Sequence, residues 1–307
     1  MSTAGRKNAK PNRIYERYKL SPVTIGLFDS GVGGLSIWQA VQRRLPNYAT
    51  LYVADNAHCP YGSRPAREVR RFSAAITRFL LAQGAQLIVV ACNTASAAAL
   101  QWLRGHFSVP FVGLEPAVKP AAQQTRSGHI GILATQGTLQ GALFRTTAGR
   151  YARDVVLHIQ TDDRLAQCVE QGQMDTSETE QLLRGYLQPM LDAGVDQLVL
   201  GCTHYPFLLP VIQRILPPEV TVIDPAEAVA RQVERCVRAL REEESQSKES
   251  SPEHRFFVTA APEMLRSLLV RATGREWPVE RLTWRAGRLV PAFGHPDPSL
   301  RGGEERA

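Results

Sequence analysis

The sequence predicts an α/β protein with two similar doubly wound domains, whose parallel sheets face a shared central cleft. Short apolar runs of strand formers alternate with helical patterns, which is typical of parallel sheets with helices on both faces. The plan also repeats. Residues 25–30 (IGLFDS) resemble residues 130–135 (IGILAT), and residues 84–92 (GAQLIVVAC) match residues 194–202 (GVDQLVLGC). Because ligands of such folds bind beyond the carboxyl ends of the strands, both repeats point to one cleft.

The first repeat contains three predicted strands, each followed by a helix. The strands cover residues 23–28, 50–53 and 87–91, and the helices begin near Leu35, Arg67 and Ala95. Leu35, Trp38 and Val41 share one helical face, as expected of a helix that covers a sheet. The first strand ends in a glycine-rich turn, residues 29–34 (DSGVGG), at the carboxyl edge of the predicted sheet.

The sequence after the second repeat indicates that the first domain is discontinuous, and both ends of the chain are predicted to be tails. Residues 256–260 and 262–272 are predicted to form a further strand and helix. We therefore expect a first domain of residues 21–116 plus 225–292 and a second of residues 117–224. Residues 242–253 (EEESQSKESSPE) have the composition of an exposed linker. Residues 1–20 are predicted to be a disordered basic arm, and residues 293–307 a loose tail.

Composition limits the class of protein. The 307 residues suffice for two domains, and no apolar run reaches the roughly 18 residues of a membrane span. The basic N-terminal stretch lacks the apolar core of a signal peptide. The five cysteines lack the spacing of a disulfide framework, which fits a reducing compartment. We therefore expect a cytoplasmic protein without a membrane partner.

The net charge of +7 leaves an acidic partner open. Arg67, Arg70 and Arg71 lie in one predicted helix, where they would form a solvated face, and no row of aromatic side chains is interleaved with them. Nucleic acid is therefore not favoured as the main partner. A basic protein that binds nucleic acid or a DNA enzyme is kept as the alternative from another functional class, since a positive field also suits a small anionic substrate.

Two cysteines stand at matching places in the two repeats. Residues 92–94 (CNT) and 202–204 (CTH) each follow a strand and precede a predicted helix. The N–H groups at a helix N-terminus favour a thiolate, so we expect the pKa of Cys92 and of Cys202 to be lowered. His204 can relay a proton to or from a thiol near neutral pH. The neighbouring amide and hydroxyl groups suit a substrate carboxylate.

Other roles for the cysteines stay open on the sequence alone. A cysteine is often a small buried apolar residue, and this interpretation is favoured for Cys59, Cys168 and Cys236. A metal site could use Cys202 with His204, or His58 with Cys59. Standard zinc-binding spacing is absent, so no metal is predicted. A disulfide between Cys92 and Cys202 is a further alternative.

The glycine-rich turn differs from nucleotide-binding loops. Ser36 stands where the pattern G-x-G-x-x-G has its last glycine, and the lysine of a P-loop is missing. The turn therefore favours a small anion over a nucleotide, with Asp29 as an acid or base near the ammonium group of the substrate.

Six segments resemble the motifs of glutamate racemases, in the order FDSGVGGLS, ADNAHCPYGSRP, ACNTAS, ATQGTL, GCTHYPFL and VIDPAEAVA. The resemblance extends from about residue 23 to residue 291, and the combination of CNTAS with GCTHYP is specific. Related aspartate and hydantoin racemases usually have Thr-Glu after the second cysteine, where this chain has Thr203-His204. The resemblance therefore implies glutamate as the substrate, and an aspartate or hydantoin racemase is the alternative within the class.

The resemblance implies a racemase that uses neither a cofactor nor a metal and that supplies D-glutamate for peptidoglycan synthesis. It makes Cys92 and Cys202 the two acid/base residues, assisted by Asp29 and His204. The implied substrate contacts are Asp29, Ser30, Tyr61, Gly62, Asn93, Thr94, Thr135, Thr138, Glu170, Thr203 and His204. One segment differs from the family pattern, since residues 161–163 (TDD) stand where members often have Ala-Cys-Pro. A homodimer is left open.

Overall fold

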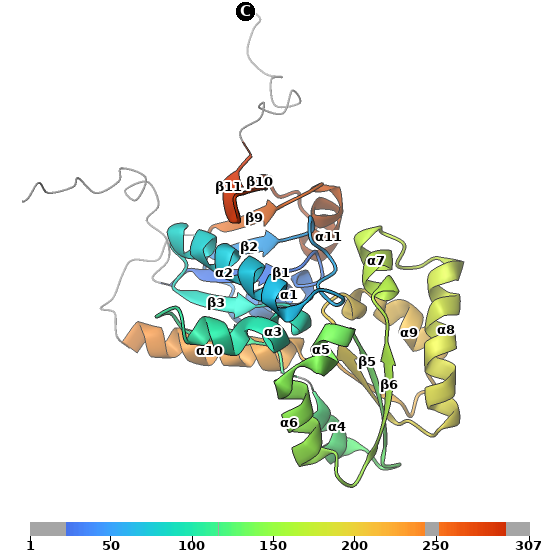
Figure 1. Ribbon diagram of the computed structural model, residues 1–307. Helices are drawn as coiled ribbons and strands as arrows, with labels where there is room; N and C mark the ends of the chain where they lie inside the picture. The colour runs from blue at the N-terminus through green and yellow to red at the C-terminus, as the bar shows by residue number, and fades with distance from the viewer. Residues whose placement is uncertain (1–22, 116, 243–251, 293–307) are drawn as a thin grey trace, which may run out of the picture.

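The computed structural model describes residues 23–115, 117–242 and 252–292. Within these ranges the chain forms two sheets with helices packed against them (Figure 1). The predicted arm at residues 1–20, the tail at 293–307 and most of the linker at 242–253 lie outside the described residues.

The larger sheet has seven strands in the order β11-β10-β9-β2-β1-β3-β4. Its strands are β1 (Ile25–Asp29), β2 (Thr50–Ala54), β3 (Leu87–Val90), β4 (Phe111–Gly113), β9 (His254–Val258), β10 (Val279–Arg285) and β11 (Arg288–Pro291). Only the pair β10–β11 departs from the predicted parallel arrangement among the described strands. Ala286 and Gly287 have φ values of 48° and 75°, so they form the two-residue turn of an antiparallel hairpin.

The smaller sheet is parallel throughout and has the strand order β6-β5-β7-β8. Its strands are β5 (His129–Ala134), β6 (Val156–Thr161), β7 (Gln197–Gly201) and β8 (Thr221–Ile223). This order matches β2-β1-β3-β4 of the larger sheet. The register matches as well, because Ile25 pairs with Leu87 in the first sheet and Ile130 pairs with Gln197 in the second. The internal repeat predicted from the sequence is therefore present in the structure.

Helices cover both faces of the larger sheet. They are α1 (Leu35–Arg44), α2 (Ala66–Ala82), α3 (Asn93–Arg104), α10 (Ala226–Glu242) and α11 (Glu263–Thr273). Successive side chains of a strand point to opposite faces, so Leu27 packs with α1, α10 and α11, whereas Phe28 packs with α2 and α3. This two-sided burial explains why the strands are continuously apolar.

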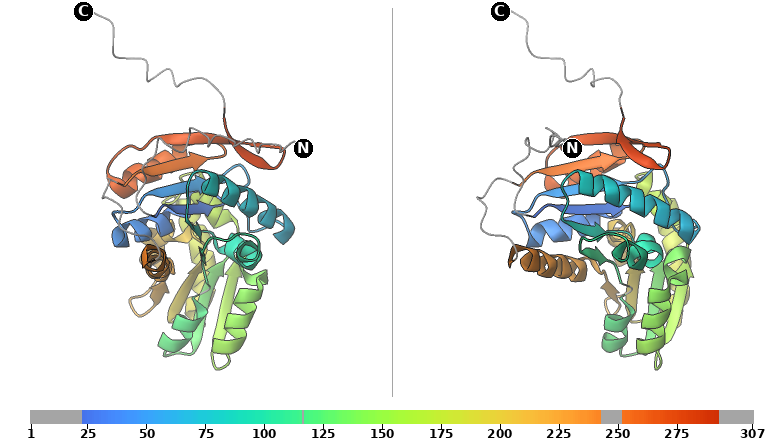
Figure 2. Two further views of the ribbon diagram at one scale, coloured as in Figure 1. Left: turned by 90° about the vertical axis from the view of Figure 1, so that its left-hand side faces the viewer. Right: turned by 60° about the vertical axis from the view of Figure 1, so that its left-hand side comes forward.

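The second half of the structure, residues 117–224, has seven helical elements around its sheet among the described residues, and most of them are short. They are α4 (Val118–Gln124), α5 (Gln136–Gln140), α6 (Ala142–Tyr151), α7 (Arg164–Glu170), α8 (Ser177–Asp192), the 3-10 helix η2 (Tyr205–Leu208) and α9 (Leu209–Ile215). One apolar cluster extends from Leu27 and Val32 of the first half to Leu200 and Tyr205 of the second. Figure 2 shows the two sheets on opposite sides of this junction. We propose that each sheet with its helices is one domain, divided at 116/117 and 224/225.

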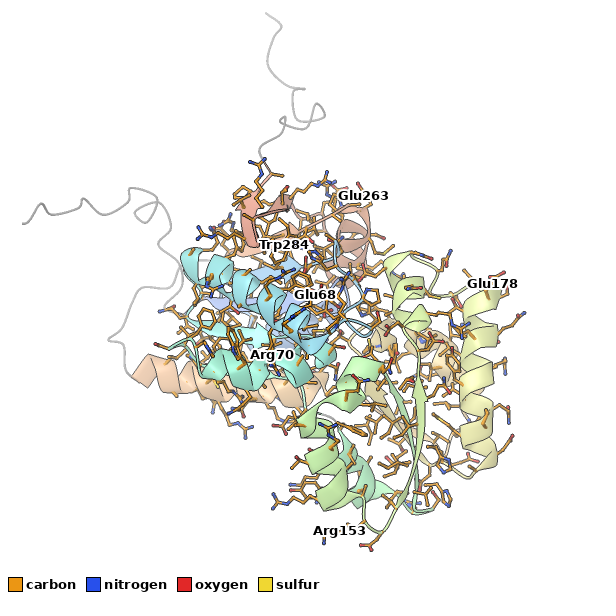
Figure 3. All side chains as sticks on the ribbon, in the orientation of Figure 1. Glu68, Arg70, Arg153, Glu178, Glu263 and Trp284 are labelled. Atoms are coloured by element: carbon orange, nitrogen blue, oxygen red, sulfur yellow. The ribbon has the colours of Figure 1, made fainter. Side chains whose placement is uncertain are left out.

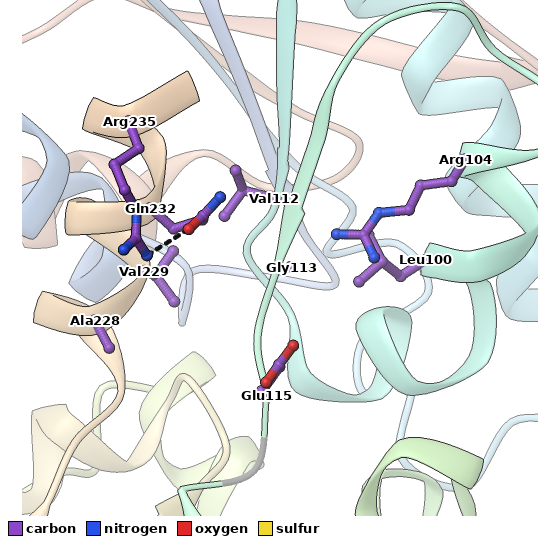
Figure 4. A pocket seen from close by; sticks show the side chains of 9 residues that line it. All are labelled: Leu100, Arg104, Val112, Gly113, Glu115, Ala228, Val229, Gln232 and Arg235. Carbon is purple, nitrogen blue, oxygen red and sulfur yellow. Dashed lines mark hydrogen bonds between the residues drawn. The ribbon is translucent and has the colours of Figure 1, made fainter. Parts of the chain in front are cut away.

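The surface agrees with the predicted solvated helix face. Arg67, Arg70 and Arg71 on α2 are exposed, and Arg70, which is labelled in Figure 3, donates to the Ala98 carbonyl of the neighbouring α3. A groove lies between α3 and α10 close to the crossing between the halves, with Arg104, Glu115 and Arg235 on its walls (Figure 4). In the part of the chain that the structure describes, each helix is too short or too polar to cross a membrane.

Candidate active site

The predicted site residues gather at the carboxyl ends of four strands. Asp29 ends β1, Cys92 follows β3, Thr135 follows β5 and Cys202 follows β7. All four are buried. Several hydrogen bonds join the halves at this place: for example, Thr94 Oγ1 lies 2.8 Å from Thr135 Oγ1, and Thr203 Oγ1 donates to Asp29 Oδ2 at 3.2 Å. The two strand repeats therefore meet at one buried polar centre.

Asp29 is the centre of this network. Its Oδ1 accepts the Ser30 backbone N–H at 2.7 Å, and its Oδ2 accepts the Gly34 N–H at 2.6 Å. A Cβ at Gly34 would lie 2.8 Å from the Asp29 Cβ, so the turn requires glycine there. Complete burial raises the pKa of Asp29, although the nearby His204 acts in the opposite direction.

Cys92 is the N-cap of α3. Its sulfur accepts the Ala95 N–H at 3.5 Å and lies 3.8 Å from Ser30 Oγ. Burial and the nearby Asp29 carboxylate nevertheless raise the pKa of Cys92 well above its ordinary value. The expected lowering is wrong for Cys92 in the substrate-free chain, because desolvation and a like charge outweigh the helix N-terminus.

Cys202 begins a chain of contacts through His204 to Glu170. The Cys202 sulfur lies 3.6 Å from His204 Nδ1, and His204 Nε2 lies 2.7 Å from Glu170 Oε1. Burial alone would lower the pKa of His204, but hydrogen bonds to Cys202, Cys59 and Glu170 raise it well above its ordinary value. Cys202 is followed by the 3-10 helix η2, which has His204 as its N-cap and Pro206 in its first turn and leads directly into α9 at Leu209. The predicted strand-to-helix junction is therefore present, although its first turn is a 3-10 helix.

The remaining polar contacts come from threonine and asparagine. The hydroxyls of Thr94, Thr135 and Thr138 form a chain with oxygen separations of 2.8 and 2.9 Å. The buried Oδ1 of Asn93 has no hydrogen-bond partner among the described residues. Since a buried unpaired acceptor is costly, this atom suits a ligand that donates hydrogen bonds.

Tyr61 and Gly62 lie at the edge of the site and have different bonding partners. The Tyr61 hydroxyl donates to Asp55 Oδ2 at 2.6 Å and is thereby committed to another carboxylate. The Gly62 carbonyl accepts the Gly137 N–H at 3.0 Å, which links the two halves. A Cβ at Gly62 would lie only 2.1 Å from Asp163 Oδ1. Asp163 is thus a neighbour of the site that sequence reasoning missed, although its segment was noted as unusual.

Cys59 is the second neighbour that sequence reasoning missed. Its sulfur lies 4.0 Å from Ser30 Oγ and close to His204 and Glu170. Burial raises the pKa of Cys59 to about 12, while a hydrogen bond with His204 opposes this shift. Among the described residues, the candidate metal-ligand group that contains Cys59 is completed by Glu170 and His204, and His58 is not part of it.

Comparison with known proteins gives consistent matches. The profile of the Asp/Glu/Hydantoin racemase family matches residues 35–233. The chain is 49% identical to a glutamate racemase of Ectopseudomonas mendocina over 218 residues, which are 71% of this chain and 83% of that protein. It is 51% identical to a glutamate racemase of a Roseiflexus species over 215 residues, which are 70% of this chain and 79% of that protein.

Solved structures with a similar fold are also glutamate racemases. A glutamate racemase isoform of Bacillus anthracis superposes with a TM-score of 0.75 at 32% identity, covering 87% of this chain and 98% of that one. The Escherichia coli glutamate racemase, solved with L-glutamate and the activator UDP-MurNAc-Ala, superposes with a TM-score of 0.74 at 32% identity, covering 85% and 98%.

Proposed function

The chain belongs to the glutamate racemases of the Asp/Glu/Hydantoin racemase family, and we propose that its buried site interconverts L- and D-glutamate by proton transfer between two thiols. One observation carries this proposal. Cys92 and Cys202 follow strands β3 and β7, which occupy the same position in two sheets of matching order and register. An enzyme that inverts a carbon needs one proton carrier on each face, and such a repeat supplies two.

The α-proton of an amino acid is weakly acidic, so its removal needs a base and stabilised charge. In the proposed reaction Cys92 takes the proton from D-glutamate and Cys202 takes it from L-glutamate. The opposite thiol then delivers a proton to the other face, and the roles exchange with direction. Asp29 assists Cys92, which is consistent with their hydrogen bond, and His204 assists Cys202, whose sulfur lies 3.6 Å from its ring.

Substrate binding also explains how a thiol with a raised pKa becomes a base. The ammonium group of glutamate beside Asp29 compensates the carboxylate that opposes ionisation of Cys92. A cation close to a thiol favours its thiolate, so the bound substrate lowers the pKa of Cys92. Asn93, Thr94 and Thr203 supply donors to the substrate carboxylate, where charge develops in the transition state. We also propose that the substrate contacts Ser30, Tyr61, Gly62, Thr135, Thr138 and Glu170.

The function is tested by circular dichroism of purified protein with L-glutamate and no added cofactor. We expect the optical signal to decay to zero, and dialysis against EDTA should leave the rate unchanged. A thiol reagent should abolish the reaction. L-Aspartate is the control substrate, because an aspartate racemase is the second candidate. Equal kcat/KM values for both acids would favour that candidate, and salt-sensitive DNA binding without turnover would favour a nucleic-acid partner.

We further propose that the product D-glutamate enters peptidoglycan synthesis and that the enzyme acts in the cytoplasm. The names of the relatives support the substrate, and the composition supports the compartment. A homodimer remains part of the proposal, and light scattering of the full chain measures it directly.

A further inference from the structure

Cys59 lies at the active site, although the proposed mechanism does not use it. Its sulfur, a carboxylate oxygen of Glu170 and a ring nitrogen of His204 all lie within 4.8 Å of one another. The three residues come from distant parts of the chain: Cys59 from the loop after β2, Glu170 from the end of α7 and His204 from the turn after β7. Folding therefore creates a compact group that no local motif encodes.

The surroundings hold this group tightly. A Cβ at Gly31 would lie 1.9 Å from Glu170 Oε1 and 2.9 Å from the Cys59 sulfur, so the backbone of the turn forms one wall. The Val32 N–H donates to Glu170 Oε1 at 2.6 Å. Such an outer hydrogen bond orients a carboxylate in the way that secondary contacts orient metal ligands.

We propose that Cys59, Glu170 and His204 form a binding site for a thiophilic divalent cation such as Zn²⁺, which occupies the cleft in place of glutamate. One sulfur, one imidazole nitrogen and one carboxylate oxygen are the ligand types that Zn²⁺ takes, and three protein ligands leave a fourth position for water. Binding displaces two protons to the solvent, one from the Cys59 thiol and one from between His204 Nε2 and Glu170, and forms bonds from the metal to the sulfur, to Nε2 and to a carboxylate oxygen.

The spacing of the three groups fits this ion after small side-chain movements. Zinc–ligand bonds of about 2.0–2.3 Å place tetrahedral ligands roughly 3.3–3.8 Å apart. His204 Nε2 and Glu170 Oε1, now 2.7 Å apart, must separate by a fraction of an ångström, and the pairs with the Cys59 sulfur must approach by at most about 1 Å.

The bound ion inhibits the enzyme, because it takes the Nε2 lone pair of His204, so that the ring can no longer carry a second proton for Cys202, and because it occupies the space of the substrate. This consequence rests on the proposed function, whereas the binding itself does not. The ion is thus an inhibitor rather than a cofactor. A chelator should restore activity to protein that was treated with the metal, whereas protein that was never exposed to the metal should be active without a chelator.

The test titrates the full chain with Co²⁺ and Zn²⁺ alone, using calorimetry and the thiolate-to-cobalt absorption. We expect one ion per chain in the wild type and at least about tenfold weaker binding in Cys59→Ala. Cys236→Ala is the matched control, because it removes a half-buried thiol of α10 away from the site and should bind as the wild type does. Cys59→Ala should still racemise glutamate and should resist Zn²⁺, and glutamate should compete with the metal.

Three results would overturn the site. They are absence of cobalt binding by the wild type, unchanged binding by Cys59→Ala, or loss of the cobalt absorption in Cys92→Ser instead of Cys59→Ala. Each is read from binding without turnover, so the metal site and the racemase function fail separately. If Cys59→Ala does not fold, Cys59→Ser with a native circular dichroism spectrum replaces it in the same titration.

Discussion

The two thiols lie in unequal electrostatic surroundings. Cys92 faces the buried carboxylate of Asp29, which raises the pKa of the thiol, whereas Cys202 lies beside His204. Glu170 supports the second arrangement, since its Oε1 lies 2.7 Å from His204 Nε2. Each thiol therefore has its own neighbouring group, and we propose that Glu170 acts on the reaction through the imidazole.

Glu170→Gln tests this link through the pH profile. The change keeps a polar side chain but removes the carboxylate whose hydrogen bond helps raise the pKa of His204. The pKa of His204 should fall, so the limb of the kcat/KM profile that reports loss of its proton should move to lower pH. Glu178→Gln, an exposed position on α8, is the control with the same change of charge. An unmoved profile in Glu170→Gln would show that Glu170 does not act through His204.

At the scale of residues, the sequence predicts those site residues whose positions are fixed by the ends of the strands. Asp29, Cys92, Thr135 and Cys202 were expected together because parallel strands bring their carboxyl ends to one edge. The approach of Cys59 and Asp163 was not predictable, since both lie in loops whose path no periodicity describes. The raised pKa of Cys92 was also missed, because the extent of burial depends on how the two halves close.

At the scale of elements, the glycine-rich turn before α1 is shaped by the opposite half. A Cβ at Gly33 would lie 2.5 Å from His204 Nδ1 and 2.7 Å from Thr203 Oγ1. Gly33→Ala should therefore displace His204 from Cys202 and reduce kcat/KM by about 10²-fold or more, as expected when a positioned acid/base group is lost. The far-UV circular dichroism should stay native.

Gly185→Ala is the matched control for this substitution. Gly185 lies on an exposed face of α8 with open space at its Cβ position, so alanine should leave activity unchanged and raise stability by up to about 1 kcal/mol. A wild-type rate in Gly33→Ala would contradict the close approach of turn and imidazole.

The longer elements were predictable, and the short ones were not. The predicted strands at 23–28, 50–53 and 87–91 correspond to β1, β2 and β3 within one or two residues at each end. Strands β4 and β8 have three residues each, which is too short for an apolar pattern to stand out. The hairpin of β10 and β11 was missed because its turn uses Ala286 instead of the usual asparagine or aspartate.

At the scale of the whole molecule, stability should depend on pH through His254. This residue lies on β9 beside Trp38 and Thr50, and burial together with Arg275 lowers its pKa from 6.5 to about 4. The unfolded chain binds a proton at this side chain between pH 6.5 and 4, but the folded chain does not. The free energy of unfolding should therefore fall as the pH falls through this window.

The urea midpoint, measured at pH 7 and at pH 4.5 in wild type and His254→Gln, isolates this contribution. The wild type should lose more stability between the two pH values than the variant does. Equal losses would mean that other groups account for the acid dependence.

The fold repeats one strand order twice and places a cysteine directly after the matching strands β3 and β7, so the central claim is that two different thiols act on the two faces of the α-carbon. Single Cys92→Ser and Cys202→Ser variants should each nearly abolish racemisation, because a serine hydroxyl is far less acidic than a thiol. Each variant keeps one thiol. Cys202→Ser should still eliminate a leaving group from the D form of N-hydroxyglutamate, and Cys92→Ser from the L form.

The most direct measurement is early turnover of either enantiomer by the wild type in D₂O. If the thiol that removes the proton is not the one that returns it, the product carries deuterium at the α-carbon while the recovered substrate gains little. Transfer of the original hydrogen to the product would indicate one base acting on both faces, and that result would contradict the two-thiol account.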